Sequence, residues 1–263
     1  MVYFLSDAHL GSRAIDNRQA HQQTLIAMLQ DMAKDATAIY LLGDIFDFWY
    51  EYFWRDESKE EYRPFLDMLK SLTAKGIDIH FYIGNHDLWT FGWLEKQTGI
   101  TVHRHPESIV INGKKIFLAH GDGLVPSNYV KQLPKNIQKK IRSFIFLRSI
   151  FHNPILQRLF RLLPPSWGNA FGYEWAKNSR LKELARPCPY KGEDHEELVL
   201  YAKEQEKLGN HHDYYIFGHR HIELDLMINK NSRIMILGEC WQQFTYAQMD
   251  EQATALLNNF EPL

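Results

Sequence analysis

Five short segments of the chain carry closely spaced side chains of the types that bind metal ions. They are Asp7-Ala8-His9, Gly43-Asp44-Ile45-Phe46-Asp47, Gly84-Asn85-His86-Asp87, His120-Gly121-Asp122 and Gly218-His219-Arg220-His221. Carboxylate, imidazole and carboxamide donors without a thiolate suit manganese, iron, zinc or magnesium rather than a soft ion. Because a carboxylate has two oxygens, it can bridge two ions that lie about 3.5–4 Å apart. We predict a site for two divalent ions, with manganese as the first expectation and Asp44 as the bridging ligand.

Each of these segments follows a short apolar run that is typical of a β-strand. The strands are predicted at Val2–Leu5, Ala38–Leu42, Ile77–Ile83, Lys115–Ala119 and Tyr214–Phe217. In open α/β sheets, ligands bind outside the carboxyl ends of the strands, so the metal-binding side chains are expected to meet at one rim. The glycines Gly43, Gly84 and Gly218 permit the tight turns that direct the next side chain into the crevice.

The segments between and after these strands complete the prediction of an α/β fold. Apolar residues at spacings of three and four predict amphipathic helices at Ala20–Met32 and Tyr62–Ala74, and Asp194–Leu208 is also expected to be helical. Further strands are predicted at Glu223–Ile228 and Arg233–Leu237. Their close spacing favours an antiparallel sheet near the carboxyl terminus. Strands alternating with helices indicate a layered α/β architecture.

A basic stretch separates the two halves of this pattern. Residues 124–191 contain 13 Lys and Arg but 2 Asp and Glu, whereas the whole chain has a net charge of −2. Helices are predicted at Ile137–Phe151 and Ile155–Leu163, ending at Pro164-Pro165. We expect a basic helical insert, or lid, at about residues 125–191. It is either an ordinary surface helix pair or a cationic amphipathic element that handles lipid.

Composition limits the class of protein and its location. The chain has two cysteines, Cys188 and Cys240, too few for a disulfide framework or a four-thiolate zinc site. The residues after Met1 lack the pattern of a signal peptide, and no apolar stretch is long enough to span a membrane. We expect one domain over residues 1–263, cytoplasmic, with peripheral contact at the inner surface of the membrane. The apolar content of the insert argues against nucleic acid as its partner.

The five segments, in this order, resemble the motifs of the calcineurin-like metallophosphoesterases. The pattern is Asp-x-His, Gly-Asp-x-x-Asp, Gly-Asn-His-Asp/Glu, His-Gly and Gly-His-x-His, and all five stand in the chain. The resemblance implies a four-layer αββα sandwich of two mixed sheets. It also implies one ion held by Asp7, His9, Asp44 and His221, and a second held by Asp44, Asn85, His120 and His219.

Within that family, the chain is most similar to the UDP-2,3-diacylglucosamine hydrolases of lipid A synthesis. Ser6–Leu10, Gly43–Trp49 and the insert carry this resemblance. It implies a lipid-linked nucleotide sugar as substrate, cut to 2,3-diacylglucosamine 1-phosphate and UMP. His86 is a departure, since those enzymes often carry Arg there. The resemblance matches Ala176–Arg186 to a lid helix whose polar side chains meet the substrate, and the expected contacts are Asn128, Asn178, Ser179, Lys182 and Arg186.

Roles for the remaining polar residues follow from general chemistry. His86 is expected to protonate the leaving oxygen as a general acid, with Asp87 orienting its ring. Asp47 and Asp122 are candidates to orient metal ligands. The aromatic run Phe46–Trp54 either lines a lipid cavity or packs in the core.

Two other functions stay open at this point. One is a general phosphodiesterase or phosphatase that acts on nucleotides or on another nucleotide-linked lipid. The other is a metal-binding scaffold that has lost catalysis, against which the retention of His86 and Asp87 argues.

Overall fold

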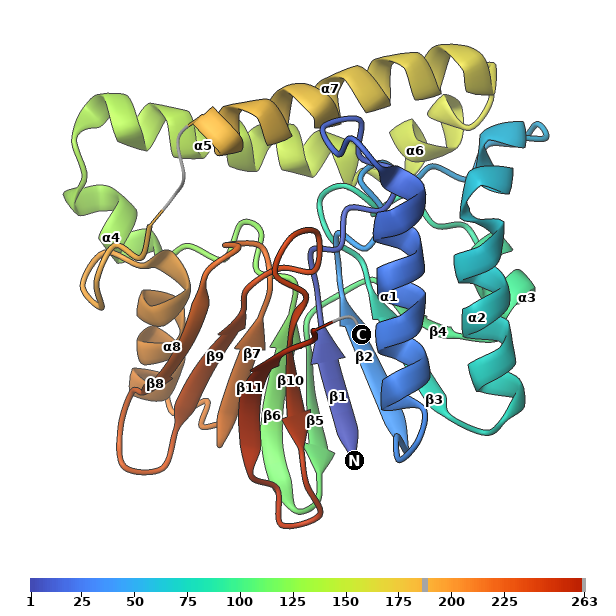
Figure 1. The fold of residues 1–263 in the computed structure, drawn as a ribbon. Helices are drawn as coiled ribbons and strands as arrows, with labels where there is room; N and C mark the ends of the chain where they lie inside the picture. The colour runs from blue at the N-terminus through green and yellow to red at the C-terminus, as the bar shows by residue number, and fades with distance from the viewer. Residues whose placement is uncertain (186–188, 262–263) are drawn as a thin grey trace.

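Two β-sheets lie face to face between layers of helices (Figure 1). The computed structural model describes residues 1–185 and 189–261. The first sheet has the order β11-β10-β1-β2-β3-β4 and the second the order β5-β6-β7-β9-β8. The first sheet contains β1 (Val2–Leu5), β2 (Ala38–Leu42), β3 (Asp78–Tyr82), β4 (Thr101–His103), β10 (Thr245–Met249) and β11 (Ala255–Asn259). The second contains β5 (Glu107–Ile111), β6 (Lys114–Ala119), β7 (Tyr214–Phe217), β8 (Glu223–Met227) and β9 (Arg233–Leu237).

Both sheets are mixed, which decides where the strand ends meet. Strands β1 to β4 pair in parallel, and β10 joins β1 antiparallel. The expected antiparallel arrangement of the late strands is correct for β8 with β9, and the unpredicted strands β10 and β11 also pair antiparallel. It is wrong for β7, which is parallel to both β6 and β9. The physical reason is the long crossover from β6 to β7 through the insert and α8, since a parallel pair needs such a connection.

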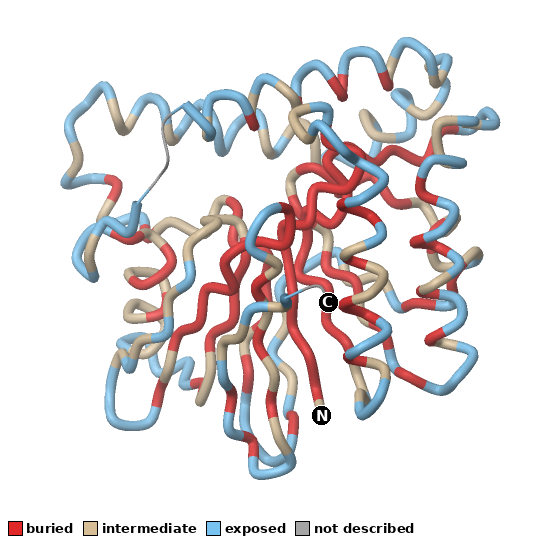
Figure 2. The backbone as a smooth tube through the Cα atoms, viewed as in Figure 1, coloured by how far each residue is buried: buried red, intermediate tan, exposed pale blue. Residues whose placement is uncertain are grey.

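Three apolar layers hold the four structural layers together. The residues between the sheets form one buried cluster that includes Phe4, Leu42, Ile116 and Met235. Helices α1 (Arg18–Met32), α2 (Arg63–Ala74) and α3 (Trp93–Thr98) cover the outer face of the first sheet, and a short 3-10 helix, Glu57–Tyr62, precedes α2. Helix α8 (Glu197–Lys207) covers the outer face of the second sheet. The backbone is accordingly buried along the centre of both sheets (Figure 2), and the predicted αββα sandwich is confirmed.

The described residues of the insert form four helices, of which the last three lie across the carboxyl ends of the central strands (Figure 1). They are α4 (Ser127–Gln132), α5 (Lys135–Phe151), α6 (Pro154–Phe160) and α7 (Pro165–Ala185). The predicted second helix ends earlier than expected, at Phe160, and the two prolines precede or begin α7 rather than end a helix. Helices α5 and α6 contain no fully buried residue, whereas α7 contributes a buried face that includes Tyr173, Ala176 and Arg180. Among the helices described, none combines the length and hydropathy that crossing a membrane requires.

Candidate metal centre

The predicted metal ligands follow the carboxyl ends of five strands, where the backbone takes an uncommon conformation. The φ angles of Asp7, His9, Asp44, His219 and His221 all lie between 45° and 68°. This left-handed region costs a non-glycine residue about 1–3 kcal/mol, and such residues gather at functional sites. Hydrogen bonds between the loops hold the conformation. The amide of Asp7 donates to the Gly43 carbonyl, and that of His9 donates to the Asp44 carbonyl, each at 3.0 Å.

The three glycines of the motifs act in two different ways. Gly43 has a φ of +83°, as a tight turn requires. Gly84 and Gly218 are needed instead because other groups approach them closely. A Cβ atom at Gly84 would lie 2.2 Å from Oδ1 of Asp44, and one at Gly218 would lie 2.5 Å from Oδ2 of Asp7. The glycines therefore make room for the carboxylates of the centre.

The first ligand cluster consists of Asp7, His9 and His221, with Asp44 beside it. Nε2 of His221 lies 3.0 Å from Oδ1 of Asp7 and 3.3 Å from Nε2 of His9. Nε2 of His9 lies 3.8 Å from Oδ1 of Asp7 and 4.0 Å from Oδ2 of Asp44. These donor atoms point toward one another from the ends of β1, β2 and β7.

The second cluster shares Asp44 and adds side chains from β3, β6 and β7. Nε2 of His120 lies 3.3 Å from Oδ2 of Asp44 and 3.3 Å from Oδ1 of Asn85. The ring of His219 lies 5.1 Å from that of His120, and the ligand atoms of Asp44, His120 and His219 fall within one group of metal-binding size. The structure thus brings all seven predicted ligands together, with Asp44 between the two clusters.

The donor set fits two divalent cations. Ligand bonds of about 2.0–2.2 Å place neighbouring donor atoms roughly 3–3.5 Å apart, close to several of the observed separations. Two imidazole nitrogens that face each other, as in His9 and His221, need a cation or a proton between them. The local charges favour a cation as well. Burial opposes a charged ring, but the Asp7 and Glu183 carboxylates raise the pKa of His221 to about 9. Burial raises the pKa of Asp44, and the neighbouring histidines, led by His120, lower it well below its usual value.

Further groups orient the ligand rings. Oδ1 of Asp47 lies 3.2 Å from Nδ1 of His9 with both side chains fully buried, which is within ion-pair distance, although neither atom completes a hydrogen bond. Nδ1 of His120 lies 2.9 Å from the Leu42 carbonyl oxygen. A ring whose outer nitrogen is held in this way presents the other nitrogen to a metal. Asp47 lies where it could orient the His9 ring, and its orienting role stays a prediction.

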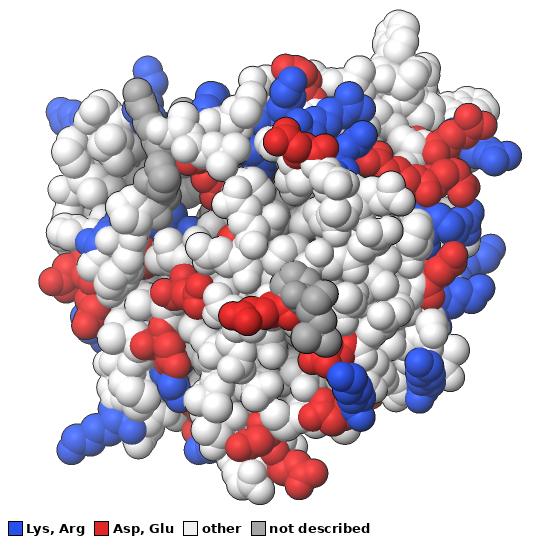
Figure 3. All heavy atoms as spheres, viewed as in Figure 1, with Lys and Arg blue, Asp and Glu red and all other residues white. Residues whose placement is uncertain are grey.

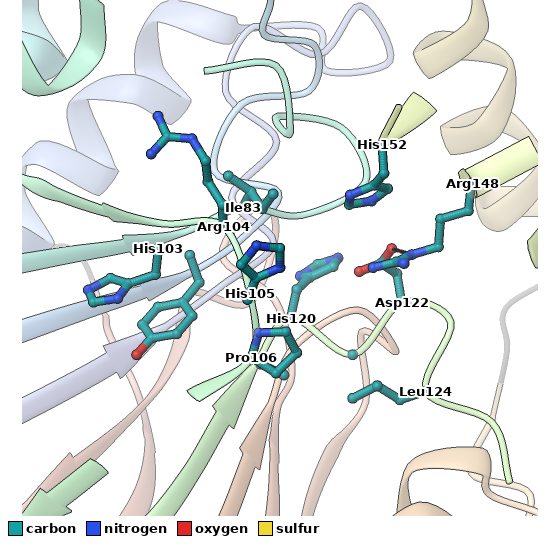
Figure 4. A pocket seen from close by; sticks show the side chains of 13 residues that line it. Ile83, His103, Arg104, His105, Pro106, His120, Asp122, Leu124, Arg148 and His152 are labelled. Carbon is teal, nitrogen blue, oxygen red and sulfur yellow. Dashed lines mark hydrogen bonds and ion pairs between the residues drawn. The ribbon is translucent and has the colours of Figure 1, made fainter. Parts of the chain in front are cut away.

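A small cavity of about 40 Å³ lies behind His120 and includes Asp122, Arg148 and His152 in its lining (Figure 4). Nε of Arg148, from α5, donates to Oδ2 of Asp122 at 2.5 Å. Burial raises the pKa of Asp122, but the charges of His120 and Arg148 bring it below its usual value. Asp122 therefore joins the insert to the rim that carries His120, rather than binding a ligand ring directly.

The insert also reaches the first cluster, through two residues that sequence reasoning missed. Oε1 of Glu183 lies 2.5 Å from Nδ1 of His221, and Nη1 of Arg180 lies 3.2 Å from the same nitrogen. Both residues lie on the face of α7 that carries the buried Ala176. Their spacing from Ala176, one and two helical turns, is the signal in the sequence that could have identified them.

His86 and Asp87 do not form the expected pair. Nδ1 of His86 donates to the carbonyl oxygen of Asp47 at 2.7 Å. The Asp87 carboxylate instead accepts backbone N–H groups of Gly84, Asp44, Ile45 and Phe46, at 2.7–3.3 Å. The expectation that Asp87 orients the His86 ring is therefore wrong. Asp87 holds the loop of the bridging carboxylate, because that loop directs three amides at it and Gly84 of its own loop supplies a fourth.

The electrostatics of His86 bear on its proposed acid role. Burial lowers the pKa of His86 to about 4, although Asp44 opposes the shift. The ring is therefore neutral at pH 7, with its proton on Nδ1 and the free pair of Nε2 facing Asp44 at 4.0 Å. An anion in the centre would favour protonation of Nε2. The general-acid role of His86 stays a proposal on that condition.

The expected substrate contacts lie away from the two clusters. Asn178 is exposed and its amide donates to the carbonyl oxygen and carboxylate of Glu174. Lys182 and Asn128 are exposed, Ser179 is half-buried, and Arg186 lies outside the described residues. Within the described residues, no polar contact joins these side chains to the ligand clusters, so their role stays a prediction.

Replacing Asp47 by Asn tests whether the Asp47 carboxylate strengthens metal binding by the first ligand cluster. The neutral amide removes the negative charge that lies 3.2 Å from Nδ1 of His9, so we expect manganese affinity to fall about 10- to 100-fold. Calorimetric titration of the metal-free variant with Mn²⁺ measures this, with Asp16→Asn, an exposed change of the same kind, as the control. Equal affinity in the two variants would contradict the role given to Asp47.

Comparison with known proteins places the chain in a family. Residues 1–223 match the family model described as calcineurin-like phosphoesterase. The chain is 32% identical over 272 residues to a UDP-2,3-diacylglucosamine hydrolase of Porphyromonas gingivalis, covering 100% of this chain and 98% of that protein. It is 28% identical over 192 residues to a protein of the same name from Neisseria meningitidis serogroup B, covering 71% of this chain and 70% of that protein. A solved dimetal phosphatase from Danio rerio aligns with 99% of this chain and 98% of its own at 13% identity, with a TM-score of 0.46. The chain belongs to the calcineurin-like phosphoesterase family of metal-dependent phosphoesterase hydrolases.

Proposed function

We propose that this hydrolase cleaves the pyrophosphate bond of UDP-2,3-diacylglucosamine, giving 2,3-diacylglucosamine 1-phosphate and UMP. The observation that carries the proposal is an apolar cavity of about 510 Å³ between the insert and the aromatic segment after β2. The full-length relative from Porphyromonas gingivalis, which bears that substrate in its name, supports it. A substrate with acyl chains on one side of the reacting phosphorus needs such a cavity next to the metal centre.

The aromatic segment serves both the core and the cavity. Phe46 and Trp49 are fully buried in the core beneath α1 and α2, where their rings stack at 4.2 Å. Phe48, Tyr50 and Tyr52 of the same segment line the cavity. The two roles considered for this run from the sequence therefore apply to its two faces.

Helix α7 forms the opposite wall and connects the cavity to the centre. Gly172 packs directly on Phe48, where a Cβ atom would lie 2.3 Å from the ring. Trp175, also in the lining, has its ring 4.8 Å from that of His86. The cavity thus begins beside the dinuclear centre. An acyl chain gains about 0.8 kcal/mol for each buried CH₂, so a cavity of this kind favours a lipid substrate.

The residues of the centre suit attack of water on phosphorus. Two bound divalent ions would supply an activated water and neutralise the phosphate charge. Asp44, whose loop Asp87 fixes, would be the residue that holds both ions. His86 directs Nε2 into the same space, where it can exchange a proton with the departing oxygen. Trp175 and the cavity wall exclude bulk water on the lipid side.

A second candidate is hydrolysis of another nucleotide-linked lipid or of simple phosphodiesters. His86 favours it, since the UDP-2,3-diacylglucosamine hydrolases that the chain resembles often carry Arg at that position. The discriminating measurement is the rate with manganese on the diacylated UDP-sugar against that on bis(p-nitrophenyl) phosphate. Comparable rates, with no gain from the acyl chains, would favour the second candidate.

The insert is also expected to touch the inner surface of the membrane, where a lipid-linked substrate lies. Its exposed apolar side chains include Phe146, Ile155, Trp167 and Phe171. Exposed Lys139, Lys140 and Arg142 lie on α5, and Lys and Arg side chains appear along the insert in Figure 3. Basic and apolar groups together favour anionic lipid surfaces.

Placing a carboxylate in the cavity should separate lipid recognition from chemistry. Leu147→Asp introduces a charge that an acyl chain cannot pair, so kcat/KM for UDP-2,3-diacylglucosamine should fall about 10- to 100-fold. Turnover of bis(p-nitrophenyl) phosphate should stay within about twofold, since the metal ligands are untouched. The matched control is Leu181→Asp on α7, which has the same 46% exposure but lies outside the cavity lining. Equal losses on both substrates would count against a lipid cavity.

Replacing Asp44 by Asn tests catalysis itself. The amide removes the shared charge between the clusters, so turnover of any phosphoester should fall on the order of a thousandfold. The measurement is initial rate with saturating manganese, and circular dichroism checks that the fold is kept. A wild-type chain without turnover on any phosphoester would instead support a catalytically inactive scaffold.

Membrane contact predicts binding to anionic vesicles. The protein should sediment with phosphatidylglycerol-containing vesicles more than with pure phosphatidylcholine, and salt should weaken the binding. Lys139→Glu should reduce it, whereas Lys207→Glu, an exposed change on α8, should not. Equal effects of the two substitutions would rule out the insert as the contact.

A further inference from the structure

Arg180 is a buried cation at the edge of the metal centre. It lies on α7 with 6% of its surface exposed. Its Nη1 lies 3.2 Å from Nδ1 and 3.4 Å from Nε2 of His221, and 2.7 Å from Oε2 of Glu183. The guanidinium therefore sits beside a nitrogen that faces the first ligand cluster. No role in the site has been assigned to this residue so far.

The guanidinium still has a donor to offer. Nε of Arg180 is buried and has no hydrogen-bond partner, although a guanidinium carries five N–H donors. Leaving such a donor unpaired inside a protein is costly, and exceptions of this kind occur at binding sites. The unpaired Nε thus indicates that a further acceptor completes the site.

The neighbouring charges specify what that acceptor is. The first cluster is built to hold a divalent cation, and a guanidinium next to it would be repelled. Glu183 balances part of the charge, but it is already shared with Nδ1 of His221. An anion that contacts both cations removes the repulsion, and phosphoryl oxygens match the planar guanidinium in geometry.

We propose that Arg180 is a substrate-binding residue that holds non-bridging oxygens of the phosphate group seated at the dinuclear centre. Glu183 positions it, through the ion pair with Nη1. The proposal deepens the proposed function, on which it rests for the identity of the phosphate compound. It assigns the phosphate contact of α7 to the face that carries Ala176, in place of the exposed Asn178 and Lys182.

Helix α7 of the insert would then contact both the phosphate and the acyl chains of the substrate. Because Arg180 and the cavity wall Trp175 lie on the same helix, phosphate and acyl chains are held by one element. A bound phosphate adds a contact between α7 and the centre, and its departure removes that contact.

The test is binding of inorganic phosphate to the manganese-loaded protein by calorimetry. Arg180→Gln should weaken phosphate binding about tenfold or more. Arg180→Lys keeps the positive charge but lacks the paired N–H donors of the guanidinium, so its phosphate affinity should lie between those of Arg180→Gln and the wild type. Lys177→Gln, which removes one cation from the same helix, should bind as the wild type does. Metal analysis of each protein should find the manganese content unchanged.

Two outcomes would overturn the proposal. One is phosphate binding by Arg180→Gln and Arg180→Lys within twofold of the wild type. The other is loss of manganese together with phosphate, which would make Arg180 a support of the metal ligands. If Arg180→Gln does not fold, Arg180→Lys decides by the same criteria. The assay needs no lipid, so a wild type that binds phosphate through Arg180 but fails to cleave UDP-2,3-diacylglucosamine would overturn the proposed substrate and leave this inference intact.

Discussion

The Asp44 carboxylate is the group on which the arrangement of the centre depends. Its Oδ2 faces His9 on one side and His120 on the other, so it joins ligands that come from both sheets. The position of this one carboxylate requires a left-handed residue after β2, a glycine at position 84 to admit Oδ1, and four amides gathered on Asp87. The left-handed residue, the glycine and the buried Asp87 carboxylate each cost folding free energy locally, and the packing of the two sheets compensates for that cost.

Side chains of the insert contact residues of the centre, so the insert does more than cover it. Arg148 contacts Asp122 behind the second cluster, and Glu183 contacts His221 in the first. Helix α7 also closes an apolar cavity whose other wall is the aromatic segment after β2. Charge and apolar surface are thus combined on the same helices. Such a combination suits a substrate that has a phosphate at one point and hydrocarbon beside it.

The motif residues could be predicted because their chemistry and their order along the chain are both visible in the sequence. Most strand bounds were predicted to within a residue, since buried strands with apolar residues on both faces are easy to recognise. The short edge strands β4 and β5 and the late β10 and β11 were missed, because their burial depends on pairing partners that lie far away in sequence. The parallel setting of β7 was missed for the same reason.

The sequence by itself determined the seven candidate ligands, the α/β alternation and the basic character of the insert, because these depend on residue types and local spacing. Only the tertiary structure decided which face of α7 meets the centre, where Arg180 and Glu183 contact His221. It also decided that the Asp87 carboxylate accepts hydrogen bonds from backbone amides and that the His86 ring donates one to the Asp47 carbonyl oxygen. The rotation of a helix about its axis and the partner of a buried carboxylate are set by contacts between distant segments. Local spacing in the sequence does not predict these contacts.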